Sequence, residues 1–250
     1  FGLERNRAEI ILAGAIILES ITDVFGIDKF LFSDYALREG LLIDELHKMG
    51  RGPASDGDAA MRSVRLLAER CDDRPDHSEH VARIALDLFD QLHQELRVGT
   101  ESRSLLEAAA LLANVGVVVS HSKHHLHSYY VIRNSELVGL TDREIELIAQ
   151  IARYHRKGMP KLEHAEFAAL SDEDRDVVRS LAGLLRVAIG LDRTQDGRVK
   201  KVKTEVVDGT LEIQFTTGKS KEGDLNAYAA TERRALLAEV LNRRVKIVAA

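Results

Sequence analysis

Apolar side chains recur every three or four residues across most of this chain, and this spacing limits the fold more than any other feature. Proline, which interrupts helices, occurs only 3 times in 250 residues. Alanine, leucine, glutamate and arginine are frequent, and all four favour helix. The pattern predicts helices at about 59–72, 76–96, 102–114, 125–134, 142–156 and 172–194. We therefore expect a mainly α-helical fold.

The first fifty residues have a different pattern. A helix is expected over 4–25, because Gly26 follows it in the place of a C-terminal cap. The short apolar run 29–32 predicts a strand, and 36–49 predicts a second helix. A single short strand needs partners, so we expect it to belong to a sheet built from other residues, and the chain to be a piece of a longer protein. Residues 50–58 have the composition of a linker.

The pattern changes again after residue 194. Residues 199–207 alternate between apolar and polar side chains, and Asp208-Gly209 is a strong hairpin signal. A second alternating run follows, with Leu211, Ile213 and Phe215. We expect a helix over 231–241, a final strand over 245–248 and a further strand at 224–229. Together these elements predict a small α+β unit after the helices.

Composition excludes several classes of protein. Hydrophobic residues make up 45% and charged residues 30%, which is typical of a globular protein with a core. The longest apolar stretch, 10–18, is broken by Gly14 and is far shorter than the ~20 residues of a membrane span. The single cysteine, Cys71, excludes a disulfide framework and favours a cytoplasmic location. A net charge of −5 argues against nucleic acid as a partner.

Histidine and basic side chains gather in two short runs. Residues 117–135 contain no aspartate or glutamate, and the second run closes the helix expected over 142–156. The candidate residues are His121, Lys123, His124, His125, His127 and Arg133 in the first run, and Arg153, His155, Arg156 and Lys157 in the second.

Three interpretations of these runs remain open from residue types alone. Neutral imidazoles at close spacing can hold a transition metal, although such sites usually include carboxylate or cysteine ligands as well. Imidazole, lysine and arginine together can donate hydrogen bonds to a phosphate. The side chains can also simply satisfy local backbone groups. Because the neighbouring residues are all hydrogen-bond donors to an anion, we favour anion binding and assign no metal ligand.

The order of motifs along the chain resembles the C-terminal half of the Ppx/GppA family of exopolyphosphatases and guanosine-pentaphosphate phosphatases. The two specific motifs are His121-Ser-Lys-His-His-Leu-His-Ser-Tyr-Tyr130 and Arg153-Tyr-His-Arg-Lys-Gly158. Weaker matches are spread over nearly the whole chain, at 7–15, 33–42, 77–82 and 185–193. One departure is Ala36, where the family usually has glycine.

The resemblance implies three domains. Residues 1–50 would be the end of an actin-like, ribonuclease-H-type catalytic lobe, and 51–197 an all-helical HD-like domain. Residues 198–250 would be a small α+β domain. In this family the phosphate loops, the catalytic carboxylate and the magnesium site belong to the part that would precede Phe1. We therefore expect no catalytic residue and no cofactor in this chain, with magnesium implied for the other half.

The HD label also suggests a metal-dependent phosphohydrolase, as an alternative. Active HD domains hold divalent metals with a histidine, a His-Asp pair and a distant aspartate. Here the first histidine corresponds to His77, but the pair falls on Ala113 and Asn114. The distant aspartate falls on Ile189, with Asp192 three residues later. Alanine and isoleucine cannot ligate a metal, so we expect this domain not to hydrolyse phosphate esters by that route.

These observations lead to one functional expectation. The chain should bind polyphosphate, or guanosine pentaphosphate, through the two runs, and should help two subunits associate as a homodimer. A purely structural dimerisation module is the second alternative. Because the reference pKa of histidine is about 6.5, we expect the affinity for phosphate chains to fall between pH 6 and pH 8.

Overall fold

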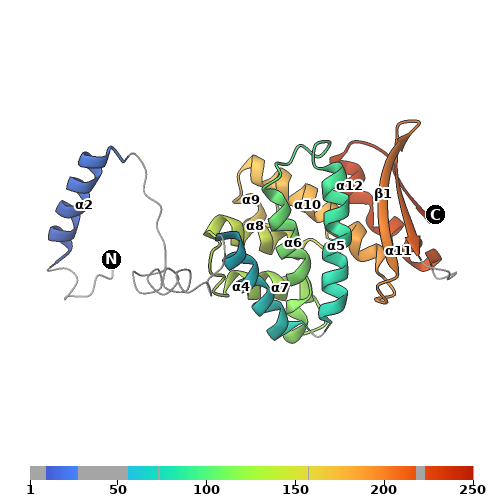
Figure 1. The fold of residues 1–250 in the computed structure, drawn as a ribbon, viewed down its shortest axis with the longest axis horizontal. Helices are drawn as coiled ribbons and strands as arrows, with labels where there is room; N and C mark the ends of the chain where they lie inside the picture. The colour runs from blue at the N-terminus through green and yellow to red at the C-terminus, as the bar shows by residue number, and fades with distance from the viewer. Residues whose placement is uncertain (1–9, 28–55, 73, 157, 218–222, 250) are drawn as a thin grey trace. The chain divides into compact units, whose positions relative to one another are not determined.

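The computed structural model describes residues 10–27, 56–72, 74–156, 158–217 and 223–249 (Figure 1). The chain divides into two compact units, Phe1–Gly52 and Pro53–Ala250, which are described separately. The strand expected at 29–32 and the helix expected at 36–49 lie outside the described residues. Within the described ranges, no helix combines the length and the apolar character that crossing a bilayer requires.

The described part of the first unit is helix α2 (Ile11–Phe25). It ends as expected at Gly26, whose φ of 59° is left-handed and whose N–H donates to the Thr22 carbonyl. Glycine adopts this conformation at little cost because it has no Cβ. The large apolar side chains of α2, such as Ile17 and Phe25, are exposed among the described residues.

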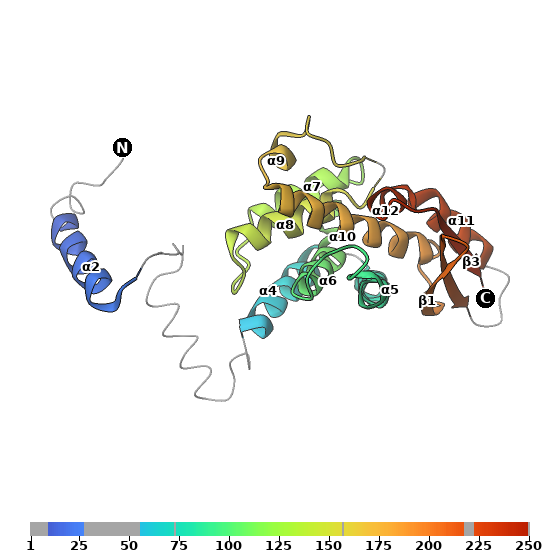
Figure 2. The same ribbon diagram turned by 90° about the horizontal axis from the view of Figure 1, so that it is seen from above.

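The second unit is built mainly of helices, which confirms the predicted fold class. They are α4 (Asp56–Cys71), α5 (Pro75–Leu92), α6 (Ser102–Leu112), α7 (His124–Arg133), α8 (Asp142–Arg153), α9 (Ala165–Ala168) and α10 (Asp172–Leu191). A short 3₁₀ helix, η1 (Val115–Val118), precedes α7. Helix α10 runs along the unit and contacts α5, α6 and α8 as well as the C-terminal helices (Figure 2).

The core lies between these helices. The apolar side chains at helical spacing on α5 and α6 are buried, and none of those named next exposes more than 7% of its surface. They are Val81, Ile84, Leu88 and Leu92 on α5, and Leu105, Leu106, Ala109 and Leu112 on α6. Helical spacing therefore identified the faces that pack together.

Side-chain caps begin two of the helices. The Thr141 side chain accepts from the Glu144 N–H, and the Glu144 carboxylate accepts from the Thr141 N–H at 2.7 Å, so α8 starts with a complete capping box. Ser171 caps α10 by accepting from the Asp174 N–H at 3.1 Å. The Asp174 carboxylate binds Arg143 instead of closing a second box.

A three-stranded sheet closes one side of the unit. Strands β1 (Val199–Val207) and β2 (Thr210–Thr217) form the predicted antiparallel hairpin, and β3 (Val245–Ala249) pairs with β2 in parallel. Asp208 and Gly209 both have positive φ, as a tight two-residue hairpin turn requires.

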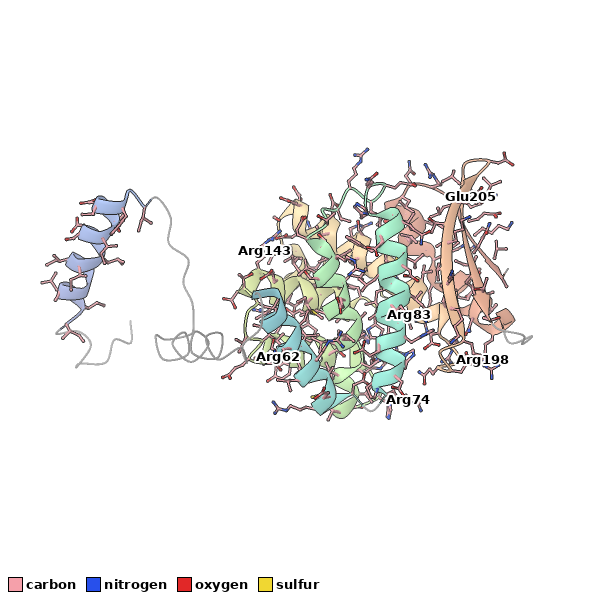
Figure 3. The ribbon with its side chains drawn as sticks, in the orientation of Figure 1. Arg62, Arg74, Arg83, Arg143, Arg198 and Glu205 are labelled. Carbon is pink, nitrogen blue, oxygen red and sulfur yellow. The ribbon has the colours of Figure 1, made fainter. Side chains whose placement is uncertain are left out.

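Helix α5 covers the free edge of β1. Gln91 accepts from the Thr204 N–H at 2.8 Å, and Arg83 donates to the Val199 carbonyl at 2.9 Å (Figure 3). These bonds satisfy edge groups that would otherwise remain open to another strand. The sheet and the helices consequently belong to the same compact unit, Pro53–Ala250.

The strand expected at 224–229 is wrong, because these residues lie in helix α11 (Gly223–Arg233). The helix expected over 231–241 is divided between the end of α11 and α12 (Ala235–Val240). Small residues explain the packing: a Cβ on Gly190 of α10 would lie 2.5 Å from the Ala230 Cα atom. The helix thus brings Ala230 into close contact with α10.

Candidate functional site: a histidine and arginine cluster

Helix α7 is held against the helical core at its first turns. Gly116 lies so close to α7 that a Cβ there would be 2.2 Å from the Ser128 nitrogen and 2.3 Å from the His124 carbonyl oxygen. Ser128 is fully buried; its hydroxyl donates to the Ala113 carbonyl at 2.8 Å and accepts from the Gly116 N–H at 3.0 Å. These contacts fix the position of the histidines that begin α7.

Three imidazoles from the two predicted runs meet at this point. His124 stacks on His155 with ring centroids 5.1 Å apart, and their Nε2 atoms are separated by 3.1 Å. The ring of His125 stands perpendicular to both, with centroids 6.3 and 6.4 Å away. The structure therefore joins residues that are 31 positions apart in the sequence.

Burial keeps these three imidazoles neutral near neutral pH. It lowers the pKa of His155 to about 3 and, with the positive charge of Arg156, the pKa of His125 to about 4. Burial also lowers the pKa of His124. The loss of affinity expected between pH 6 and pH 8 rests on the reference pKa of histidine, and burial lowers the pKa of each of these side chains below it.

The other hydrogen bonds of His124 and His155 leave no proton for the contact between their Nε2 atoms. His124 Nδ1 lies 3.1 Å from the His121 carbonyl and His155 Nδ1 lies 2.6 Å from the Ala152 carbonyl. Since a carbonyl only accepts, both contacts place the proton on Nδ1 and leave two Nε2 lone pairs facing each other. Two arrangements would place a proton between the two Nε2 atoms. In the first, the proton of His124 moves from Nδ1 to Nε2 and the contact with the His121 carbonyl is lost. In the second, the pair binds an additional proton, which a nearby anion would favour.

The remaining candidates of the first run fall into two groups. His121 and Lys123 are exposed in the turn before α7, and His127 is half-buried on the helix. Lys123 has a positive φ of 54°, which sharply turns the chain into α7. Arg133 is instead bound to Glu146 at 2.7 Å, so a ligand would have to compete with that carboxylate.

The residues of the second run also differ in whether a carboxylate binds them. Arg153 forms an ion pair with Glu166 at 2.9 Å, and its guanidinium lies over the Tyr129 and Tyr154 rings. Arg156 is half-buried, and no carboxylate of the described residues lies within 4 Å of it. Lys157 lies outside the described residues.

Sequence reasoning missed three arginines that lie near this cluster. Arg186 is buried on α10 and donates to the carbonyls of Tyr154, at 2.6 Å, and of Gly158. Arg233 is half-buried at the end of α11, and Arg193 is exposed just after α10. Residues 184–188 are apolar except for Arg186, and a single charge in an apolar run could have marked that residue. No local pattern marked Arg233 as a site residue, although it lies within the helix expected over 231–241.

The positions that correspond to metal ligands in active HD domains contact one another or the core in this chain. His77 Nδ1 lies 2.7 Å from an Asp192 carboxylate oxygen, and both side chains are buried. Ala113 is buried in the core and Ile189 packs against it. In the described ranges, no set of three or more histidine, cysteine, aspartate or glutamate side chains is placed to hold a metal ion.

These features define a mainly α-helical protein in which three imidazoles from two segments meet. Comparison with protein families then identifies it: residues 60–234 match Ppx/GppA phosphatase, domain III, and residues 1–49 match the Ppx/GppA phosphatase family. The chain belongs to the Ppx/GppA phosphatase family.

Curated relatives agree with this assignment. The chain is 28% identical to a guanosine-5'-triphosphate,3'-diphosphate pyrophosphatase of Pseudoalteromonas atlantica over 93% of its own length and 45% of the relative. It is 30% identical to the protein of that name from Aeromonas hydrophila, over 90% of the chain and 44% of the relative. The chain thus spans less than half the length of these relatives.

Proposed function

We propose that this chain is the C-terminal part of a cytoplasmic exopolyphosphatase or guanosine-pentaphosphate phosphatase, and that it holds the phosphate chain of the ligand while a separate lobe performs hydrolysis. The relatives named above carry guanosine pentaphosphate hydrolysis in their names, which supports a phosphorylated ligand. Magnesium would act in that other lobe, and no step assigned to the described residues needs it. Subunit association as a homodimer is part of the same proposal.

The observation that carries the proposal is the absence of carboxylates beside the exposed donors. Lys123 and His121 precede α7 in a stretch without acidic residues, and Arg156 lies beside the imidazoles with no carboxylate of the described residues in contact. The charges of Arg156 and Arg233 oppose a metal cation next to His124 and His155 and favour an anion. Polyphosphate would be held electrostatically, as other polyanions are.

The exposed turn before α7 should contribute to the affinity. Replacing both His121 and Lys123 with alanine is expected to weaken polyphosphate binding and to reduce the slope of log affinity against log salt by about 1, because one permanent cation is lost. Titration of the purified chain with polyphosphate at several salt concentrations measures both quantities. The control replaces Arg243 and Arg244, before β3, with alanine. Equal losses in the control would indicate diffuse surface charge and contradict the proposal.

The purified chain is expected to show no turnover of polyphosphate, guanosine pentaphosphate or phosphomonoesters with Mg²⁺ or Mn²⁺. The reason is that Ala113, Asn114 and Ile189 stand where HD hydrolases have ligands. Phosphate release measures the result. Turnover that survives repurification and disappears in His77→Ala would establish the metal-dependent hydrolase instead. A chain that dimerises but binds no phosphate chain at low salt would be a structural module.

A further inference from the structure

Two glycines on α10 show how the C-terminal helices lie on it. A Cβ on Gly183 would be 3.2 Å from the Leu237 Cα atom, and one on Gly190 would be 2.5 Å from that of Ala230. Since the numbers rise on α10 as they fall on the partner, α10 runs antiparallel to α11 and α12. This pairing places Arg233 at nearly the same level as Arg186.

The same region contains the loop after α8. The guanidinium of Arg186 is bound to the Tyr154 and Gly158 carbonyls, so it lies under the loop that carries Arg156. Burial lowers the pKa of Arg233, and the charges of Arg193 and Arg156 lower it further. Burial and the charge of Arg233 likewise lower the pKa of Arg186 to about 10. Arg233 therefore lies within electrostatic reach of Arg156, Arg186 and Arg193, which come from two other segments.

These arginines form no ion pair with a carboxylate among the described residues. Among the described residues, no carboxylate lies within 4 Å of Arg156, Arg186, Arg193 or Arg233. Asp192, next to Arg193 in sequence, is buried and turned toward His77. A group of like charges without counter-charges destabilises the folded chain, and burial of Arg186 and Arg233 adds to the cost. A bound anion would offset both effects.

We propose that Arg156, Arg193 and Arg233 form a seat for a pyrophosphate group, with buried Arg186 supporting the loop beneath it. Guanidinium groups bind phosphate oxygens through paired N–H donors, and two linked phosphates offer enough charge and oxygens for several arginines. The inference rests on the proposed function, because it assigns the phosphate ligand a specific seat. Such a site should bind ligands that contain a pyrophosphate group more tightly than single phosphates, which carry fewer charges.

The test compares binding with stability in the purified chain. Arg193→Met and Arg233→Met are each expected to weaken binding of inorganic pyrophosphate at least about tenfold, measured by calorimetry, because each removes charge-assisted bonds. Wild type should bind pyrophosphate more tightly than orthophosphate. In buffer without multivalent anions, Arg233→Met is expected to unfold at a higher temperature than wild type, because it removes a repelled, half-buried charge. If Arg233 only stabilised the fold, Arg233→Met would unfold at a lower temperature than wild type.

The matched control is Arg103→Met on α6, where Arg103 binds Asp90 at 2.8 Å. It should leave pyrophosphate affinity unchanged and should not raise the unfolding temperature. Unchanged affinity in Arg193→Met and Arg233→Met, an equal loss in Arg103→Met, or a lower unfolding temperature in Arg233→Met would overturn the inference. Arg193 is exposed, so its variant gives a result even if Arg233→Met does not fold.

The two proposals can fail separately. If the His121 and Lys123 double variant binds polyphosphate normally while the arginine variants lose pyrophosphate, the turn before α7 is not the binding surface. If the double variant weakens polyphosphate binding but the arginine variants bind pyrophosphate normally, the seat is wrong and the proposed function stands.

Discussion

Replacing Gly116 with alanine is expected to lower the free energy of unfolding by about 3 kcal/mol, as overpacking of a close backbone contact does. The added Cβ would meet the Ser128 nitrogen at 2.2 Å and the His124 carbonyl at 2.3 Å. Both atoms are backbone, so no side chain can move aside and α7 itself has to shift. Urea unfolding at pH 7.5 measures the change.

The same variant should also separate His124 from His155, because α7 carries the first of these rings. Imidazole NMR signals of the folded variant report that movement. Gly158→Ala is the matched control, since nothing lies within 4 Å of a Cβ there, and it should have little effect. Ser128→Ala gives a milder probe of the same contact, with an expected loss of about 2 kcal/mol from two unpaired backbone groups. A fully stable Gly116→Ala protein would show that α7 is not held this closely.

His155 should make the stability of the protein depend on pH. Its pKa is about 3 in the folded chain, whereas an unfolded histidine titrates near 6.5. The unfolded state therefore takes up the proton first as the pH falls, so stability is complete above about 6.5 and is lost progressively toward pH 3. At pH 5 the loss from this one ring is about 2 kcal/mol.

His155→Asn isolates that contribution, because the asparagine amide can still donate to the Ala152 carbonyl. Between pH 7.5 and pH 5.0, wild type is expected to lose about 2 kcal/mol more of its unfolding free energy than the variant. His121→Asn, at an exposed position, should follow wild type. Identical pH profiles for wild type and His155→Asn would mean that the ring is already protonated in the folded chain, with the additional proton shared between His155 and His124.

Local patterns in the sequence were enough for most of the helical unit. Spacing identified the buried faces of α5 and α6, and the Thr141 and Ser171 caps mark where α8 and α10 begin. The Asp208-Gly209 hairpin was predicted from backbone chemistry alone. These features depend on side chains three or four positions apart, or on the conformations open to single residues, so the sequence contains the information directly.

The failures all occur where distant segments meet. Residues 224–229 lie in helix α11, in which Ala230 packs on Gly190, a contact between segments forty residues apart in the sequence. The motif 121–130 could be recognised as a candidate, but the reference pKa of histidine is higher than the pKa of His124 and His125 in the folded chain. Burial beside His155 and the charge of Arg156 determine those pKa values.

The sequence by itself therefore determined the mainly α-helical fold class, the caps, the hairpin and the resemblance that family comparison confirmed. Only the tertiary structure decided which imidazoles are neutral, and which arginines lie beside them. The physical reason is that desolvation and Coulomb interactions depend on distance in space rather than along the chain. Arg233 joins Arg186 and Arg156 only because α11 packs antiparallel on α10, and no neighbouring residue encodes that contact.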